Sequence, residues 1–123
     1  MKKIISTGLL LLAIVFSGSL TAQDSAEADR LTGVWEPSHG KAKVKIEKIA
    51  DKYYGKIVWL KEPIDPETKQ PKLDKNNPDE KLQNKPLRGY RILKDFQYTD
   101  KNEWTEGTIY DPENGNTYSC IIK

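Results

Sequence analysis

The sequence contains one cysteine and one histidine, and this shortage excludes several kinds of site. Cys120 has no second cysteine with which to form an intrachain disulfide. Together with His39, it falls short of the cysteine and histidine sets that hold zinc. Cys120 lies in an apolar, strand-like run, which favours a buried thiol over a reactive thiol or an intermolecular bridge. No metal and no cofactor are therefore predicted.

Net charge is also nearly absent. The chain has 20 Lys and Arg residues against 18 Asp and Glu residues, which gives a formal net charge of +2. Residues 1–22 hold two of the lysines and no acid, so basic and acidic residues cancel in residues 23–123. A neutral domain has no overall field that attracts polyanions, and we therefore predict no nucleic-acid partner.

Long apolar runs are missing except at the N-terminus, where the order of residues is that of a signal peptide. Lys2 and the lysine after it precede a mainly apolar run from Ile4 to Phe16, and small residues surround Ala22. The run is shorter than the roughly 20 residues that span a bilayer. Residues 1–22 are predicted to be cleaved, although an uncleaved anchor is the alternative. The protein is then periplasmic or secreted, without stable membrane insertion.

The rest of the chain has the periodicity of β-strands rather than of helices. Ala42, Val44 and Ile46 alternate with lysines, which predicts a strand with one wet face. Residues 53–60 are rich in aromatic and β-branched residues and form the second arm of a hairpin. Four more strands are predicted, over residues 31–36, 87–93, 103–110 and 117–122. Residues 23–30 are predicted to be a flexible leader or one helical turn.

Residues 61–86 form a long proline-rich loop between the third and fourth predicted strands. Such a loop is unusual in a compact domain, and it is either a functional lid or a segment ordered by its own turns. Gly55, Gly89 and Gly107 each interrupt an apolar strand pattern. Repeated interior glycines favour a strongly curled sheet over isolated bulges. Residues 31–123 are thus predicted to be a single, antiparallel, all-β domain.

Several motifs resemble those of a bacterial exported family called domain of unknown function 2147. They are Gly33–Trp35, Gly55–Leu60, Leu73–Asp74, Asn77–Asp79, Pro86–Gly89, and Trp104 with Gly107 and residues 109–119. The resemblance implies a lipocalin-like curled sheet or small β-barrel, and no catalytic residue is established for the family. Family members typically continue past the position of Lys123 with further strands. The resemblance therefore also implies a sheet that is incomplete at its C-terminus.

Aromatic side chains are the candidates for a ligand site. The set comprises Trp35, Trp59, Tyr90, Trp104, Tyr110 and Tyr118. A small barrel is either filled by its own side chains or holds one small ligand. These residues are therefore either the core or the lining of a site for a small apolar or amphipathic molecule, with Tyr90 and Tyr110 at its rim.

Polar turn residues form a second group of candidates, namely Asp74, Asn77, Asp79, Asp111 and Asn114. Such residues are typical of turns. The segment from Asp74 to Asp79 is superficially similar to a calcium loop, but it lacks the central glycine and the distant glutamate.

Three functions follow from these residues. A non-enzymatic ligand-binding protein is favoured, and an envelope protein–protein interaction module is the second candidate. The third is a hydrolase that uses loop carboxylates or His39, which lies in a loop without a recognised nucleophile motif. No catalytic residue is assigned.

Overall fold

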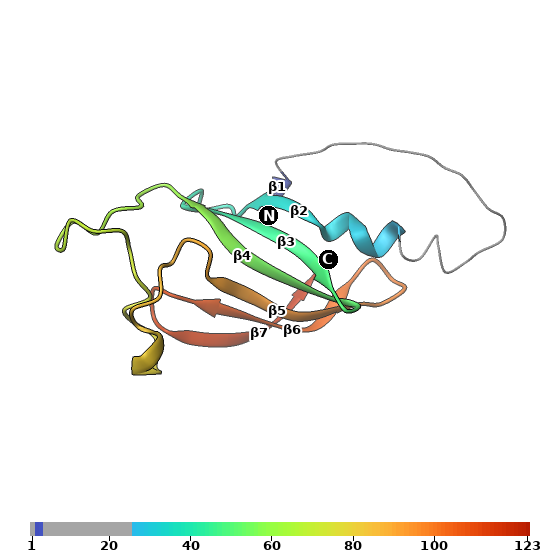
Figure 1. Ribbon diagram of the computed structural model, residues 1–123. Coiled ribbons are helices and arrows are strands. Elements are labelled where there is room, and N and C mark those ends of the chain that lie inside the picture. The colour runs from blue at the N-terminus through green and yellow to red at the C-terminus, as the bar shows by residue number, and fades with distance from the viewer. Residues whose placement is uncertain (1, 4–25) are drawn as a thin grey trace.

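The computed structural model describes residues 2–3 and 26–123, and one antiparallel sheet dominates it (Figure 1). The strands are β1 (Lys2–Lys3), β2 (Gly33–Glu36), β3 (Ala42–Ile49), β4 (Lys52–Leu60), β5 (Arg91–Tyr98), β6 (Trp104–Asp111) and β7 (Asn116–Ile122). Each strand pairs with the next one along the chain. Two short 3-10 helices are present, η1 (Asp29–Leu31) and η2 (Glu80–Leu82). The prediction of an antiparallel all-β fold is confirmed.

The sheet is curled but open, because no pairing within the described ranges joins β7 back to β1 or β2. Apart from β1, the predicted signal peptide lies outside the residues that the structure describes. Across residues 2–3 and 26–123, we find no helix with the length and apolar character needed to span a bilayer.

The β3–β4 hairpin follows the predicted alternation. Val44 and Ile46 are 2 % exposed and face the interior, whereas Lys45 between them is exposed. Ala50 and Asp51 connect the strands with positive φ angles of 49° and 68°. Two successive residues of this kind make a tight turn whose twist matches that of the strands.

Strand β5 begins at Arg91 rather than at Leu87, so its predicted position is wrong. Gly89 has a φ of +93° and belongs to the turn that precedes the strand, not to a strand interior. The strand then continues through Tyr98 because a bulge at Asp95, with a φ of +64°, lets both Leu93 and Phe96 face inward. Because the inward residues Leu93 and Phe96 are three positions apart, the strand lacks the period-2 alternation by which strands are predicted.

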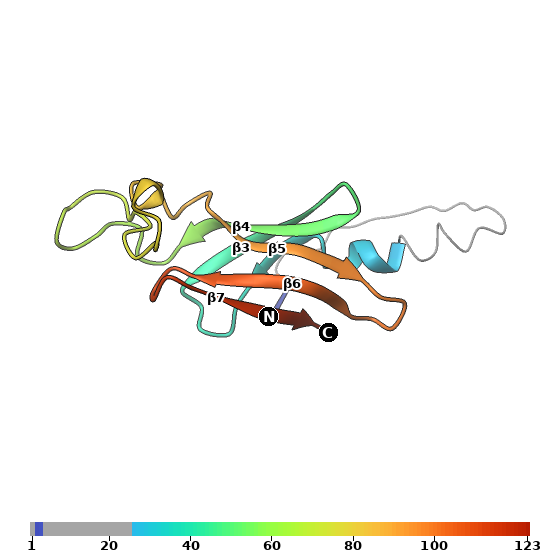
Figure 2. The same cartoon turned by 90° about the horizontal axis from the view of Figure 1, so that it is seen from below.

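The two ends of the curled sheet are filled differently. At one end, residues 26–31 are helical and cover a core formed with Leu31, Ile46, Tyr53, Phe96 and Trp104. There, the Trp104 indole donates a hydrogen bond of 3.1 Å to the carbonyl of Ala28. Figure 2 shows the helical residues at this end and the long loop before β5 at the other. Side chains therefore plug one end of the sheet, and the loop covers the opposite end.

Candidate functional site

A cavity of about 710 Å³ lies at the end of the sheet that the loop covers. Its apolar lining comes from all strands between β3 and β7 and from the loop, and comprises Ala42, Val44, Ile57, Leu60, Leu73, Leu87, Ile92, Leu93, Ile109, Tyr110 and Tyr118. Charged side chains line the remainder, including Lys41, Lys61, Lys72, Lys75, Glu62, Asp65, Glu67, Asp111 and Glu113. The volume and the mixture of an apolar wall with polar groups are typical of small-molecule sites.

A β-bulge decides which residue of β4 reaches this cavity. Val44 pairs with Ile57, but Lys43 pairs with Trp59, so Val58 is the extra residue. The extra residue turns Trp59 outward, where 40 % of its surface is exposed and the Lys43 ammonium lies 4.7 Å from the ring centre. Leu60 faces inward instead and lines the cavity.

The loop is fixed to the curled sheet by a buried polar cluster around Asp74, which is 0 % exposed. The Tyr110 hydroxyl donates a hydrogen bond of 2.8 Å to Oδ1 of Asp74, and the Asn77 amide donates one of the same length to Oδ2. The Asn77 amide also donates to the Tyr90 hydroxyl, at 2.9 Å. The ring of Tyr90 packs against that of Tyr110, with 5.6 Å between their centres. This Asp74 cluster, formed by Asp74, Asn77, Tyr90 and Tyr110, therefore joins the loop to β6.

A second connection joins the loop to the β6–β7 turn. The Asn76 amide donates to the carbonyls of Pro112 and Glu113, both at 3.0 Å. Gly115 in that turn has a φ of +76°, and a Cβ there would overlap the Asn76 carbonyl oxygen. The turn therefore requires glycine both for its backbone conformation and for the close approach of the loop.

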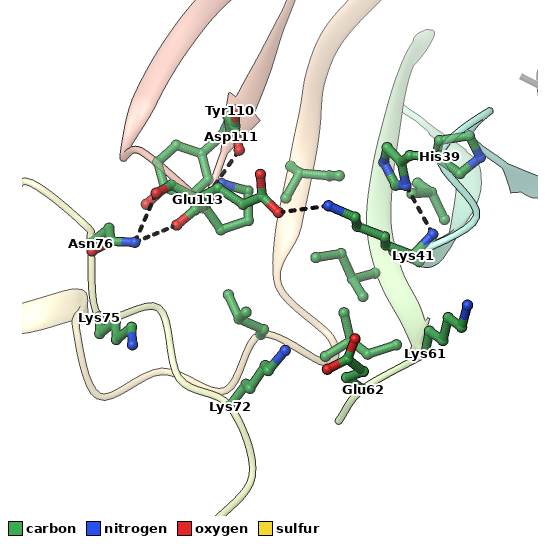
Figure 3. A pocket seen from close by; sticks show the side chains of 18 of the residues that line it. His39, Lys41, Lys61, Glu62, Lys72, Lys75, Asn76, Tyr110, Asp111 and Glu113 are labelled. Carbon is green, nitrogen blue, oxygen red and sulfur yellow. Dashed lines mark hydrogen bonds and ion pairs between the residues drawn. The ribbon is translucent and has the colours of Figure 1, made fainter. Parts of the chain in front are cut away.

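Two ion pairs lie at the rim of the cavity. Lys41 and Glu113, which Figure 3 joins by a dashed line, are 3.7 Å apart. Lys75 lies 3.8 Å from Asp65. Within the described part of the chain, Lys61 and Lys72 form no ion pair. Two lysines on the rim are thus available to a polar group of a ligand.

His39 also lines the cavity, and its ring is oriented by the backbone. Its Nδ1 atom accepts a hydrogen bond of 2.9 Å from the N–H of Lys41 (Figure 3). No group of three His, Cys, Asp or Glu side chains in residues 26–123 is placed to hold a metal ion.

The model of a family described as an uncharacterized protein conserved in bacteria, DUF2147, matches residues 33–123. The chain belongs to this family. Among solved structures, a protein from Helicobacter pylori, HP1028, which is described as a member of the lipocalin family, is similar with a TM-score of 0.56 and 26 % identity. The match covers 72 % of this chain and 57 % of the Helicobacter chain. No curated protein matches significantly.

Of the six aromatic candidates, this DUF2147 domain brings two into the cavity lining, Tyr110 and Tyr118. Tyr90 packs behind Tyr110 in the Asp74 cluster. Trp104 belongs to the core at the other end of the sheet, beneath helical residues 26–31. Trp35 packs against that core, and its indole donates to the carbonyl of Leu31 at 2.7 Å. Trp59 faces solvent.

The polar turn candidates of the DUF2147 domain separate in a similar way. Asp74 and Asn77 are buried in the cluster beneath the loop. Asp79 accepts from the N–H of Lys81 at the start of η2, and Asp111 and Asn114 accept backbone N–H groups in the β6–β7 turn. Of these five, Asp111 lines the cavity.

The cavity residues that sequence reasoning missed are leucines and lysines near strand ends. The bulge in β4 hides the inward position of Leu60, and Leu87 lies in the loop before β5 rather than in the strand that the sequence predicts. The sequence signal for the rim is a lysine before β3 and another after β4. These residues, Lys41 and Lys61, lie together at the open end of the hairpin, where a 2.9 Å backbone hydrogen bond joins them.

Burial raises the pKa of the Tyr110 hydroxyl, and the hydrogen bond to Asp74 raises it further. Burial and the bond to Asp29 likewise raise the pKa of Tyr53. Above about pH 10 the unfolded chain therefore loses tyrosine protons that the folded chain keeps. The free energy of unfolding should consequently fall as the pH rises from that value. Urea unfolding at a series of alkaline pH values measures this dependence.

The variant Tyr110→Phe tests the origin of this pH dependence. It removes one of the hydroxyls whose pKa is raised, so its unfolding free energy should fall less steeply with alkaline pH than that of the unmodified protein. An equally steep fall would show that Tyr110 does not contribute.

Proposed function

We propose that this protein is an exported, non-enzymatic binding protein that holds one small amphipathic molecule in the cavity. The observation that carries the proposal is a 710 Å³ cavity with an apolar wall and charged groups at its rim. The apolar part of the ligand packs on the inner faces of β3 to β7, and its polar part contacts the rim. The signal-peptide pattern of residues 1–22 supports export.

Three features support binding rather than catalysis. Both carboxylate oxygens of Asp74 accept structural hydrogen bonds, and Nδ1 of His39 accepts a backbone N–H. The wall consists mainly of aliphatic side chains. Such side chains favour binding because a ligand that covers them removes apolar surface from water, and they carry no reactive group. The similarity to a protein of the lipocalin family points in the same direction.

A fluorescent fatty acid, dansyl-undecanoic acid, is a suitable probe because it combines an apolar chain with a carboxylate. We expect saturable binding with increased dansyl fluorescence. Ala42 lines the cavity near its rim, so Ala42→Trp should place an indole in the space and weaken binding by about tenfold or more.

The matched control is Ser119→Trp, because Ser119 is exposed on β7 and is adjacent to Tyr118, which lines the cavity from the opposite face. It adds the same indole outside the cavity and should leave the affinity unchanged. Equal loss in both variants, or no saturable binding by the unmodified protein, would contradict the cavity as the site.

The free edge of β7 favours a second candidate, an envelope interaction module. Tyr118 is 47 % exposed and Ile121 is 59 % exposed on a strand with one unpaired edge in the described chain. Such an edge accepts a strand from a partner protein. Native mass spectrometry of the exported protein separates the two functions. A small discrete mass excess supports ligand binding, whereas a monomer without bound ligand favours the interaction module.

A further inference from the structure

Three cationic residues form a row across the outer face of the sheet. Lys45 of β3 pairs directly with Lys56 of β4, and Lys56 pairs directly with Arg91 of β5. All three are exposed. Directly opposed residues on neighbouring strands have Cβ atoms about 5 Å apart, and like charges in such positions repel each other. The repulsion within the row therefore lowers the folding stability of the isolated protein. Anions bound at the row would relieve this repulsion.

The row is incompletely neutralised within the protein. Among the described residues, Glu47 alone forms an ion pair with a cation of this row, at 3.5 Å from Lys56. Lys43 extends the positive charge along β3, where its ammonium covers the Trp59 ring. We call Lys43, Lys45, Lys56, Trp59 and Arg91 the cationic face.

We propose that the cationic face docks the protein on the surface of an anionic lipid bilayer. A bilayer presents phosphates in a plane, which suits a row of cations on a sheet. Each Lys or Arg near such a surface strengthens binding roughly fivefold. Trp59 adds a half-exposed indole, a side chain that partitions to the headgroup level of membranes. Residues 23–123 have no net charge in total, but the positive charge of the cationic face is local, because most of the balancing acids lie elsewhere.

The aromatic rings favour a membrane over a single-stranded nucleic acid. Proteins that bind single strands need open ring faces on which bases stack. Here the Arg91 guanidinium lies 4.8 Å from the centre of the Tyr54 ring, and Lys43 lies over Trp59. Both rings already have a cation over one face, so they make poor stacking platforms.

The cationic face also lies next to the cavity. The Lys43–Trp59 pair is followed along the hairpin by Ala42 and Leu60, which line the cavity, and then by Lys41 and Lys61 at its rim. A docked protein would therefore hold the cavity rim near the lipid headgroups. Exchange of an amphipathic ligand with the bilayer rests on the proposed function, whereas docking itself does not.

Sedimentation with lipid vesicles tests the docking, using the exported protein without added ligand. Vesicles of phosphatidylcholine containing phosphatidylglycerol should bind the protein, and pure phosphatidylcholine vesicles should bind it much more weakly. Binding should weaken as salt is added. The triple variant K45Q/K56Q/R91Q should bind the anionic vesicles about a hundredfold more weakly.

The matched control is K69Q/K81Q/K101Q, which removes three exposed lysines outside the cationic face and changes the net charge equally. It should bind like the unmodified protein, and circular dichroism of both variants should show an intact sheet. Equal loss in the two triple variants, binding that ignores lipid charge, or binding of single-stranded DNA without binding of anionic vesicles would overturn the proposal. Dansyl-undecanoic acid affinity, measured separately, reports on the cavity alone.

Discussion

Replacing Asp74 by alanine should lower the free energy of unfolding by about 4 kcal/mol, because two charge-assisted hydrogen bonds are lost and their donors stay buried. The donors are the Tyr110 hydroxyl and the Asn77 amide, and Asn77 is 5 % exposed. Since the same bonds fix the loop over the cavity, the variant should also bind dansyl-undecanoic acid more weakly. Urea unfolding and probe titration measure the two effects.

The variant Asp74→Asn sharpens this test because it keeps the shape of the side chain. Its oxygen can still accept from Tyr110, but its amide then faces the amide of Asn77, which places two donors together. It should lose about half as much stability as the alanine variant. Asp79→Asn is the matched control, because an amide oxygen can still accept the N–H of Lys81. Similar stability of the Asp74 and Asp79 variants would contradict the role of the cluster.

Gly107→Ala should cost about 3 kcal/mol of stability, near the upper end of the range for overpacking a core. The Phe96 ring, which is 1 % exposed, lies over Gly107 so closely that an added Cβ would overlap three of its atoms. A rigid ring enclosed by the core cannot rotate away from the new methyl group. Chemical unfolding monitored by circular dichroism measures the loss.

Gly55→Ala is the internal comparison for Gly107→Ala. A Cβ at Gly55 would meet the end of the Leu93 side chain at 2.8 Å, and a leucine can change its rotamer. The cost should therefore be smaller than at Gly107. The substitution Phe96→Leu should also reduce the additional cost of Gly107→Ala, as a double-mutant cycle would show. Equal costs at both glycines would mean that the Phe96 ring does not set the constraint.

Local patterns made the β3–β4 hairpin predictable, because inward and outward residues alternate along β3 and a short turn follows. The same rule fails on β4, where one extra residue at Val58 exchanges the roles of Trp59 and Leu60. Alternation also fails on β5 and β6, where Asp95 and Glu106 adopt positive φ angles within bulges. A bulge depends on the partner strand and leaves little trace in the sequence of its own strand.

The cavity was less predictable than the fold because its parts lie far apart in the chain. The sequence places Asp74 in a turn-rich segment and in a family motif, but neither reveals its contact with Tyr110, which joins the loop to β6. The role of Asn76 likewise depends on carbonyls of the β6–β7 turn. Polar residues in a proline-rich loop are expected on chemical grounds whether or not they anchor the loop, so composition cannot distinguish the two.

The order of the strands in the sheet also determines where chain entropy opposes assembly. From β2 to β7, every pair of neighbouring strands is consecutive in the sequence. Short turns connect β3 to β4, β5 to β6 and β6 to β7, whereas pairing of β4 with β5 must close residues 61–90. The entropic cost of closing a loop grows with its length. The hairpin β3–β4 and the meander β5–β7 are thus two locally connected units, and the largest closure cost between them falls at the segment that carries the Asp74 cluster.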